Sequence, residues 1–206
     1  MIHSSQEKEF IFIHNPKVAG SSINKWLSEI CEDYDPKGFS YIYEDEHIDL
    51  AATHHFKIVI PYEKWEKYFK FAFVRNPYDK MISGWKYFQK LEGLDYSFQE
   101  FIEKLDQLRC YPSVVWHSII SQSTHLPKGE EIFIYKYENL QNTLELFARA
   151  FKLAFKEIPR VNTTDHNNYQ SYYDEDLANM VYDRFEEDFI NFNYHKDSWK
   201  IDFKEN

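Results

Sequence analysis

The 206-residue chain contains few glycines, prolines and cysteines: five, seven and two, respectively. Scarce glycine and proline, together with aromatic residues at 19%, exclude a low-complexity or disordered chain. Two cysteines are too few for a disulfide framework, and Cys31 and Cys110 lack the close spacing of a metal site. These absences favour a folded protein in a reducing compartment.

Positive charge is also scarce: the formal net charge is −10, and no run of lysine or arginine exceeds two residues. This argues against binding of nucleic acid or an anionic membrane through a basic patch. The first seven residues lack the pattern of a leader peptide, and no apolar run approaches the roughly 18 residues of a membrane span. We therefore expect a cytoplasmic protein with no stable membrane insertion and no nucleic-acid partner. The sequence leaves the oligomeric state open.

Short apolar runs alternate with helical patterns along the chain. The predicted strands cover 9–14, 57–60, 70–74 and 132–135, and the main predicted helices cover 62–69, 77–89, 140–151 and 174–190. This alternation predicts an α/β fold, in which a central, mainly parallel sheet is flanked by helices. The length favours a single domain over residues 1–206. Ligands of such sheets bind at the carboxyl ends of the strands.

The first strand leads into a lysine-containing loop and a helix that opens on two serines. Its sequence is His-Asn-Pro-Lys-Val-Ala-Gly-Ser-Ser over residues 14–22. Backbone N–H groups at a helix start are unpaired and lie at the positive end of the helix dipole, so such a loop binds phosphate. Lys17 comes three residues before Gly20, unlike the lysine of the G-x-x-x-x-G-K-[ST] triphosphatase loop. The loop therefore indicates a phosphate ligand other than a nucleoside triphosphate tail.

A second polar motif follows the predicted strand 70–74. Arg75 leaves this strand, and Ser83 lies six residues past Pro77, about 9 Å along a helix axis. A guanidinium that folds back over this span could hold one phosphate together with the serine hydroxyl. Alternatively, Arg75 pairs with Asp79 or another acid, and Ser83 only packs within its helix. Two separate phosphate sites at one sheet edge suggest a nucleotide phosphorylated at two positions.

These motifs together resemble the sulfotransferase family. Residues 12–22 resemble its 5′-phosphosulfate loop, and residues 73–79 with Ser83 resemble its 3′-phosphate motif. Residues 134–140 and 172–194 resemble its late strand with an acidic turn and its closing helix. The resemblance covers about residues 9–195 and is closest to the carbohydrate, family 2 type, sulfotransferases.

The resemblance implies a P-loop-like fold and a donor, 3′-phosphoadenosine 5′-phosphosulfate (PAPS), with adenosine 3′,5′-bisphosphate (PAP) as the product. The sulfuryl group would pass to a hydroxyl or amine, on a carbohydrate or glycoconjugate, without a metal. By this carry-over Lys17 is catalytic, because it would steady the charge that leaves on the donor. The residues implied in donor binding are Lys17, Val18, Ala19, Gly20, Ser21, Ser22, Arg75 and Ser83.

The base that takes the acceptor's proton is assigned by the same resemblance to His55. Histidine suits this role because its ordinary pKa lies near neutrality. In this alignment His54 replaces a family glycine, and a shift of one residue would make His54 the base instead. Other branches of the family use a glutamate, and both histidines could also be ordinary residues beside a strand.

Two rival functions remain open at this point. A nucleotide-dependent, kinase-like phosphotransferase could use the same loop, although the missing G-x-x-x-x-G-K-[ST] pattern disfavours it. A catalytically silent relative could bind a nucleotide or a partner as an interaction module. Titration of PAP without Mg²⁺ against Mg-ATP separates the phosphotransferase, and turnover of PAPS with a panel of acceptors separates the silent relative.

Overall fold

The computed structural model describes residues 2–35, 62–93, 95–110, 119–159 and 168–202. The chain divides into two compact units. Unit 1 contains Met1–Val74 and Thr124–Asn162, and unit 2 contains Arg75–Ser123 and Thr163–Asn206. The predicted strand at 57–60 lies outside the described residues.

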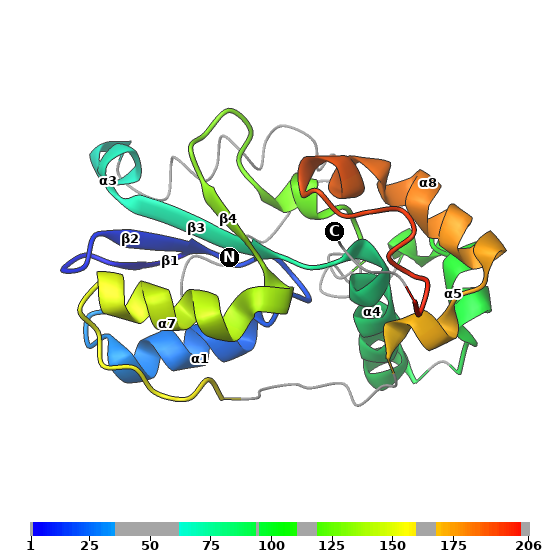
Figure 1. The fold of residues 1–206 in the computed structure, drawn as a ribbon, viewed down its shortest axis with the longest axis horizontal. Helices are drawn as coiled ribbons and strands as arrows, with labels where there is room; N and C mark the ends of the chain where they lie inside the picture. The colour runs from blue at the N-terminus through cyan, green and yellow to red at the C-terminus, as the bar shows by residue number, and fades with distance from the viewer. Residues whose placement is uncertain (1, 36–61, 94, 111–118, 160–167, 203–206) are drawn as a thin grey trace. The chain divides into compact units, whose positions relative to one another are not determined.

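Unit 1 is built on a four-stranded sheet (Figure 1). The strands follow the order β1-β2-β3-β4: β1 Ile2–Ser5, β2 Phe10–Ile13, β3 Phe69–Val74 and β4 Phe133–Lys136. Its helices are α1 Gly20–Ile30, α3 Tyr62–Lys67, α7 Leu140–Ala150 and the short 3₁₀ helix η3 Tyr137–Asn139. β1 runs antiparallel to β2, whereas β2 with β3 and β3 with β4 are parallel.

The register of β2 and β3 determines where the first loop leaves the sheet. Phe10 lies opposite Phe69, and Ile13 lies opposite Ala72. β2 is apolar throughout and β3 is apolar except for Lys70, which is typical of central parallel strands buried on both faces. Their carboxyl ends therefore share one edge of the sheet, and the Lys17 loop begins at this edge.

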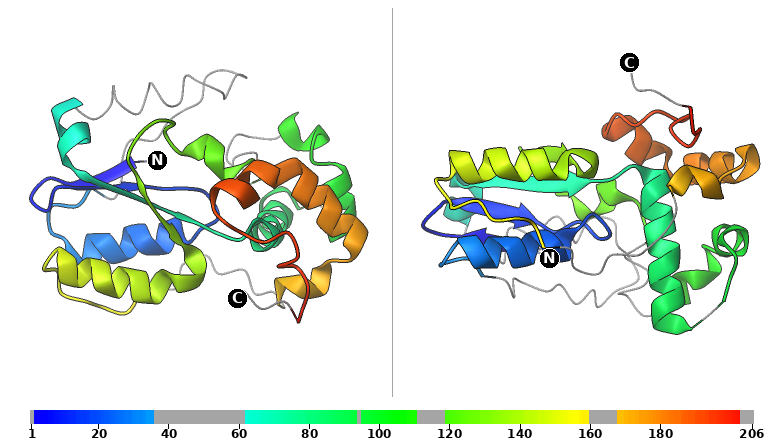
Figure 2. Two further views of the ribbon diagram at one scale, coloured as in Figure 1. Left: turned by 45° about the horizontal axis from the view of Figure 1, so that its top comes forward. Right: turned by 60° about the horizontal axis from the view of Figure 1, so that its bottom comes forward.

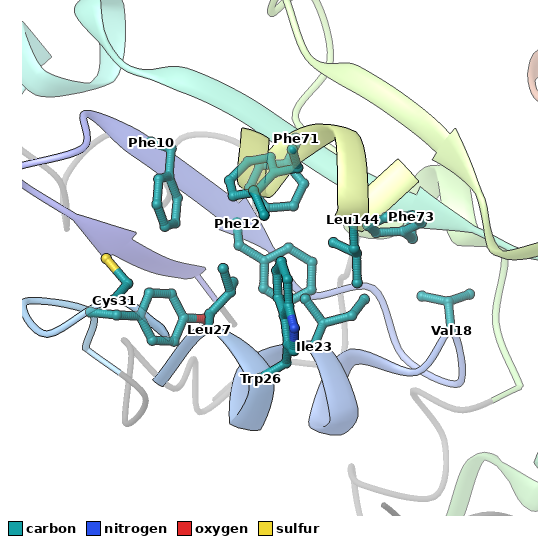
Figure 3. Close-up of a cluster of buried hydrophobic side chains, with 13 residues drawn as sticks. Phe10, Phe12, Val18, Ile23, Trp26, Leu27, Cys31, Phe71, Phe73 and Leu144 are labelled. Carbon is teal, nitrogen blue, oxygen red and sulfur yellow. The ribbon is translucent and has the colours of Figure 1, made fainter. Parts of the chain in front are cut away.

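One face of the sheet is covered by α1 and α7, which lie side by side along it (Figure 2). Side chains two residues apart on a strand share a face, so β2 and β3 both present alternate phenylalanines to these helices. Figure 3 shows Trp26 and Ile23 of α1 reaching toward Phe12 of β2. The core consists of Phe10, Phe12, Val18, Ile23, Trp26, Leu27, Cys31, Tyr34, Phe71, Phe73, Leu144, Phe147 and Ala148.

Unit 2 is helical in its described part. It contains α4 Pro77–Glu92, α5 Phe98–Glu103, α8 Glu175–Asn191 and the 3₁₀ helices η1 Gln107–Cys110 and η4 Tyr169–Tyr172. The remaining 3₁₀ helix, η2 Gln122–His125, spans the boundary between the units. The fully buried Tyr78 at the start of α4 packs against Tyr173 and Phe189, with ring centroids 4.9 and 4.8 Å away.

The predicted α/β class, with a mainly parallel sheet and flanking helices, is confirmed for the described residues. The antiparallel edge strand β1 was not predicted. In the described part of the chain, no helix is both long and apolar enough to cross a membrane. The single-domain organisation and the P-loop-like assignment stay predictions.

Candidate functional site

The loop between β2 and α1 has an unusual backbone. Lys17 has a φ of 64° and Ala19 a φ of 60°, so two residues that carry a Cβ adopt the left-handed conformation. Each such residue costs about 1 kcal/mol or more, and strain of this kind is concentrated at ligand-binding positions. The strain requires surroundings that hold the loop in place.

Two contacts among the described residues help to hold the loop. The first is Val18, whose side chain lies fully buried in the core at one end of the cluster (Figure 3). Because this side chain is inside the core, only the backbone of Val18 is suited to contact a ligand. The burial also fixes the flanking Lys17 and Ala19, both of which are half-buried.

The second contact joins Gly20 to His14. A Cβ on Gly20 would lie 1.9 Å from both Cδ2 and Nε2 of the His14 ring, so glycine is required here for space. The imidazole also stacks on Phe12, with ring centroids 6.0 Å apart. Burial lowers the pKa of His14 to about 3, so the ring is neutral near pH 7. The uncharged His14 ring therefore lies against Phe12 of the sheet and beside Gly20, the first residue of α1.

The N-terminus of α1 suits an anion. Its N-cap residue is Ala19, which has no side-chain acceptor for the first N–H groups, and the first turn holds no acidic residue. Ile23 N–H donates to the Ala19 carbonyl at 3.0 Å and opens the helical hydrogen-bond ladder. Ser21 is exposed and Ser22 is buried. The positive end of this helix is thus not neutralised by a cap of its own.

Asn15 adds a polar group beside the same loop. Its side chain is fully buried, and neither Oδ1 nor Nδ2 has a hydrogen-bond partner among the described residues. A buried polar group without a partner costs roughly 1–3 kcal/mol, so the amide is suited to a ligand oxygen or an ordered water. From the sequence, His14 and Asn15 only depart from the family pattern and are expected to have no effect on donor binding, although a polar residue between a buried strand and Pro16 is the signal that could have found Asn15.

The turn into α4 in unit 2 is built differently. Asn76 is the N-cap, and its side chain accepts a hydrogen bond from the Tyr78 N–H at 3.0 Å. Pro77 occupies the first helical position, where its missing N–H costs nothing. Asn76 Nδ2 also donates to the Ser198 hydroxyl at 2.8 Å. This helix start is therefore capped by its own sequence.

Arg75 directly precedes that cap. Its Nε donates to Oδ2 of Asp79 at 2.6 Å, and both side chains are largely buried, at 10% and 13% exposure. The pairing with Asp79, considered above as an alternative to phosphate binding, thus exists. The pair restrains the guanidinium, which is compatible with either role. Ser83 is buried two turns into α4.

One comparison decides the family. The model of the Sulfotransferase family matches residues 2–195, nearly the whole chain and parts of both units. The chain belongs to the sulfotransferase family. The resemblance drawn from the two motifs is confirmed, and the chain is a transferase of sulfuryl groups in the general sense. Searches of curated proteins and of solved structures found no significant match.

The predicted site residues of this sulfotransferase fall into two groups. Residues 17–22 lie in unit 1, whereas Arg75 and Ser83 lie in unit 2. His54 and His55 lie outside the described residues, so the assignment of the base stays a prediction. Within the described residues, no group of three or more His, Cys, Asp or Glu side chains is placed to hold a metal ion.

Proposed function

We propose that this sulfotransferase moves the sulfuryl group of PAPS, in one in-line step, to a hydroxyl or amine of a saccharide acceptor. The observation that carries the donor assignment is the strained Lys17, three residues before the uncapped N-terminus of α1. This arrangement suits a single phosphate group with a charged leaving oxygen better than a triphosphate tail. The P-loop-like fold belongs to the same proposal.

Three observations support the fit of the 5′-phosphosulfate group to unit 1. The first turn of α1 has neither a side-chain cap at Ala19 nor an acidic residue. The buried Asn15 amide lacks partners among the described residues. Gly20 lets α1 begin close to His14, which brings the helix N-terminus to the loop.

The chemistry divides between the donor and the chain. Bound PAPS supplies an activated sulfuryl group whose leaving group is the 5′-phosphate. The Lys17 ammonium and the N–H groups of the first turn of α1 would stabilise the negative charge that grows on this leaving group. Loss of one such preorganised donor typically lowers a rate by about 10²–10³.

The 3′-phosphate of the donor is assigned to Arg75 and Ser83. A guanidinium binds phosphate through paired N–H donors in a fixed plane, and the bond to Asp79 Oδ2 restrains the guanidinium of Arg75. The Ser83 hydroxyl would complete the contact from α4. This second phosphate site distinguishes PAPS from donors that carry phosphate only at the 5′ position.

His55 is assigned, on the resemblance alone, as the base that takes the acceptor's proton. Paired variants separate this base from its neighbour. His55→Ala should slow transfer by about 10²–10⁴ while leaving PAP affinity within twofold, whereas His54→Ala should change neither the rate nor the PAP affinity. The reverse result would move the base to His54, and full activity of both variants would exclude the histidine pair.

Isothermal titration tests the donor. We expect tight binding of PAP without Mg²⁺, weaker binding of AMP, and release of PAP from PAPS when a panel of sulfatable saccharides is added. A strict preference for Mg-ATP would overturn the proposal in favour of a phosphotransferase. Binding of PAP without turnover on any acceptor would favour the silent interaction module.

A further inference from the structure

We propose that Gln122 and Asp188 are positioning residues that hold Arg75 in its donor-binding orientation; this inference rests on the proposed function. Gln122 is fully buried, and its side-chain amide makes two bonds to the backbone of Arg75. The Arg75 N–H donates to Oε1 at 2.8 Å, and Nε2 donates to the Arg75 carbonyl at 2.8 Å. This two-point contact fixes the peptide groups on both sides of Arg75 and hence the direction in which its Cα–Cβ bond leaves the backbone.

Asp188 of α8 holds Gln122 in turn. Its carboxylate is fully buried and accepts the N–H of Gln122 at Oδ2, at 2.7 Å. Oδ1 accepts the Ser123 N–H at 2.9 Å and the hydroxyls of Ser121 and Ser123 at 2.6 and 3.0 Å. Four donors from three consecutive residues satisfy one buried carboxylate. The segment 121–123 is thereby fixed against α8.

Lys80 connects the same segment to α4. Its buried ammonium donates to the Ile120 carbonyl at 2.6 Å. Burial lowers the pKa of Lys80 to about 8, and the negative charge of Asp188 acts against this shift. Segment 120–123 is therefore held from α4 by Lys80 and from α8 by Asp188, and it holds Arg75 through Gln122.

A purely structural function explains this network less well than a positioning function. Buried charges and amides gain little net stability over apolar groups of similar volume, because desolvation offsets their interactions. Bidentate recognition of phosphate, in contrast, depends on a fixed guanidinium. A displacement of about 1 Å at a site of this kind can lower activity by up to about 10²-fold. The network supplies the rigidity that such a site requires.

The test compares two nucleotides that differ only in the 3′-phosphate. Gln122→Met keeps the side-chain length but removes both bonds to Arg75. We expect the affinity for PAP to fall about tenfold while the affinity for AMP stays unchanged, because only PAP uses the arginine. Gln89→Met is the matched control: Gln89 Nε2 donates to the Tyr96 carbonyl at 3.1 Å in the same unit, and its loss should leave the PAP to AMP ratio unchanged.

The outcomes are distinguishable. A folded Gln122→Met protein that keeps the wild-type PAP to AMP ratio would overturn the positioning role, and so would equal losses for both nucleotides. A wild-type protein that does not discriminate PAP from AMP would instead overturn the assignment of the 3′-phosphate to Arg75. Should Gln122→Met fail to fold in thermal melts, Ser123→Ala removes the hydroxyl bond to Asp188, together with the bond that this hydroxyl accepts from Asn191 Nδ2 at 3.3 Å, and should shift the same ratio by about twofold.

Discussion

The turn that carries Lys17 and the turn that carries Arg75 differ in how their helix starts are capped. The loop before α1 leaves its helix uncapped and keeps two left-handed residues, Lys17 and Ala19. The turn before α4 is capped by Asn76, starts with Pro77 and is bonded to Gln122 on both sides of Arg75. In the first turn the backbone itself is suited to bind the anion, so a cap would compete with the ligand. In the second turn the Arg75 side chain is suited to bind the anion, so the backbone that carries this side chain must be fixed.

The two turns thus differ in their backbone strain and in how completely their hydrogen bonds are made. In the Lys17 loop the buried Asn15 amide has no hydrogen-bond partner among the described residues. The Arg75 turn has its backbone bonds made before any ligand arrives. We therefore expect ligand binding to stabilise unit 1 more directly than unit 2.

The largest effect should follow from Lys17→Ala. Removing the ammonium from the uncapped helix start should lower the rate of sulfuryl transfer by about 10²–10³, because charge on the leaving group is no longer stabilised. The rate of PAP release from PAPS at saturating acceptor measures it. Lys25→Ala, an exposed lysine of the same helix, is the control and should retain full activity. Equal transfer rates for Lys17→Ala and Lys25→Ala would show that Lys17 has no catalytic role.

Arg75→Gln tests the second turn and should act on binding. Loss of a charged hydrogen bond to phosphate weakens binding by roughly 10- to 100-fold, so the affinity for PAP should fall by this factor while AMP is unaffected. Titration calorimetry with both nucleotides gives the ratio. Arg149→Gln, which removes an exposed pair with Glu145, should change neither affinity. If Arg75 only pairs with Asp79, the variant would lose stability without changing the ratio.

Gly20→Ala breaks the contact that brings α1 to the sheet edge. The new methyl group would lie 1.9 Å from the His14 ring, and overpacking of this kind costs about 1–3 kcal/mol of unfolding free energy. Urea unfolding of the variant measures the loss. The double variant Gly20→Ala with His14→Ala opens the space and should be less destabilised than the sum of the single changes. Strict additivity would show that the two residues do not press on one another.

The class of fold was predictable from the sequence, and both candidate anion-binding motifs were recognisable in it, because these depend on local patterns. Apolar runs such as residues 70–74 and the spacing of Lys17 from Gly20 are visible without a structure. The edge strand β1 was missed because its two inner residues are His3 and Ser4, and His3 is buried against Phe12 only through pairing with β2. Long-range pairing of this kind leaves no local signal.

The residues that hold Arg75 in place could not be predicted from the sequence either. Gln122 lies 47 positions from Arg75, and Asp188 lies 66 positions from Gln122. Each is an ordinary polar residue in its local context, and only the fold makes it buried and bonded. The pairing of Arg75 with Asp79 was foreseeable, because an i, i+4 spacing at a helix start brings such side chains together.

The smallest effect tests whether the strain in the first turn serves binding. Ala19→Gly removes the penalty of a Cβ at a φ of 60°, which should raise the unfolding free energy by up to about 1 kcal/mol. The freed loop should bind PAP about twofold more weakly, since part of its preorganisation is lost. Lys152→Gly, at a φ of 54° beyond the end of α7, gives a matched relief of strain away from the loop. The Lys152→Gly variant should gain stability while its PAP affinity stays constant. If the PAP affinity is unchanged in both variants, the strain at Ala19 does not contribute to donor binding.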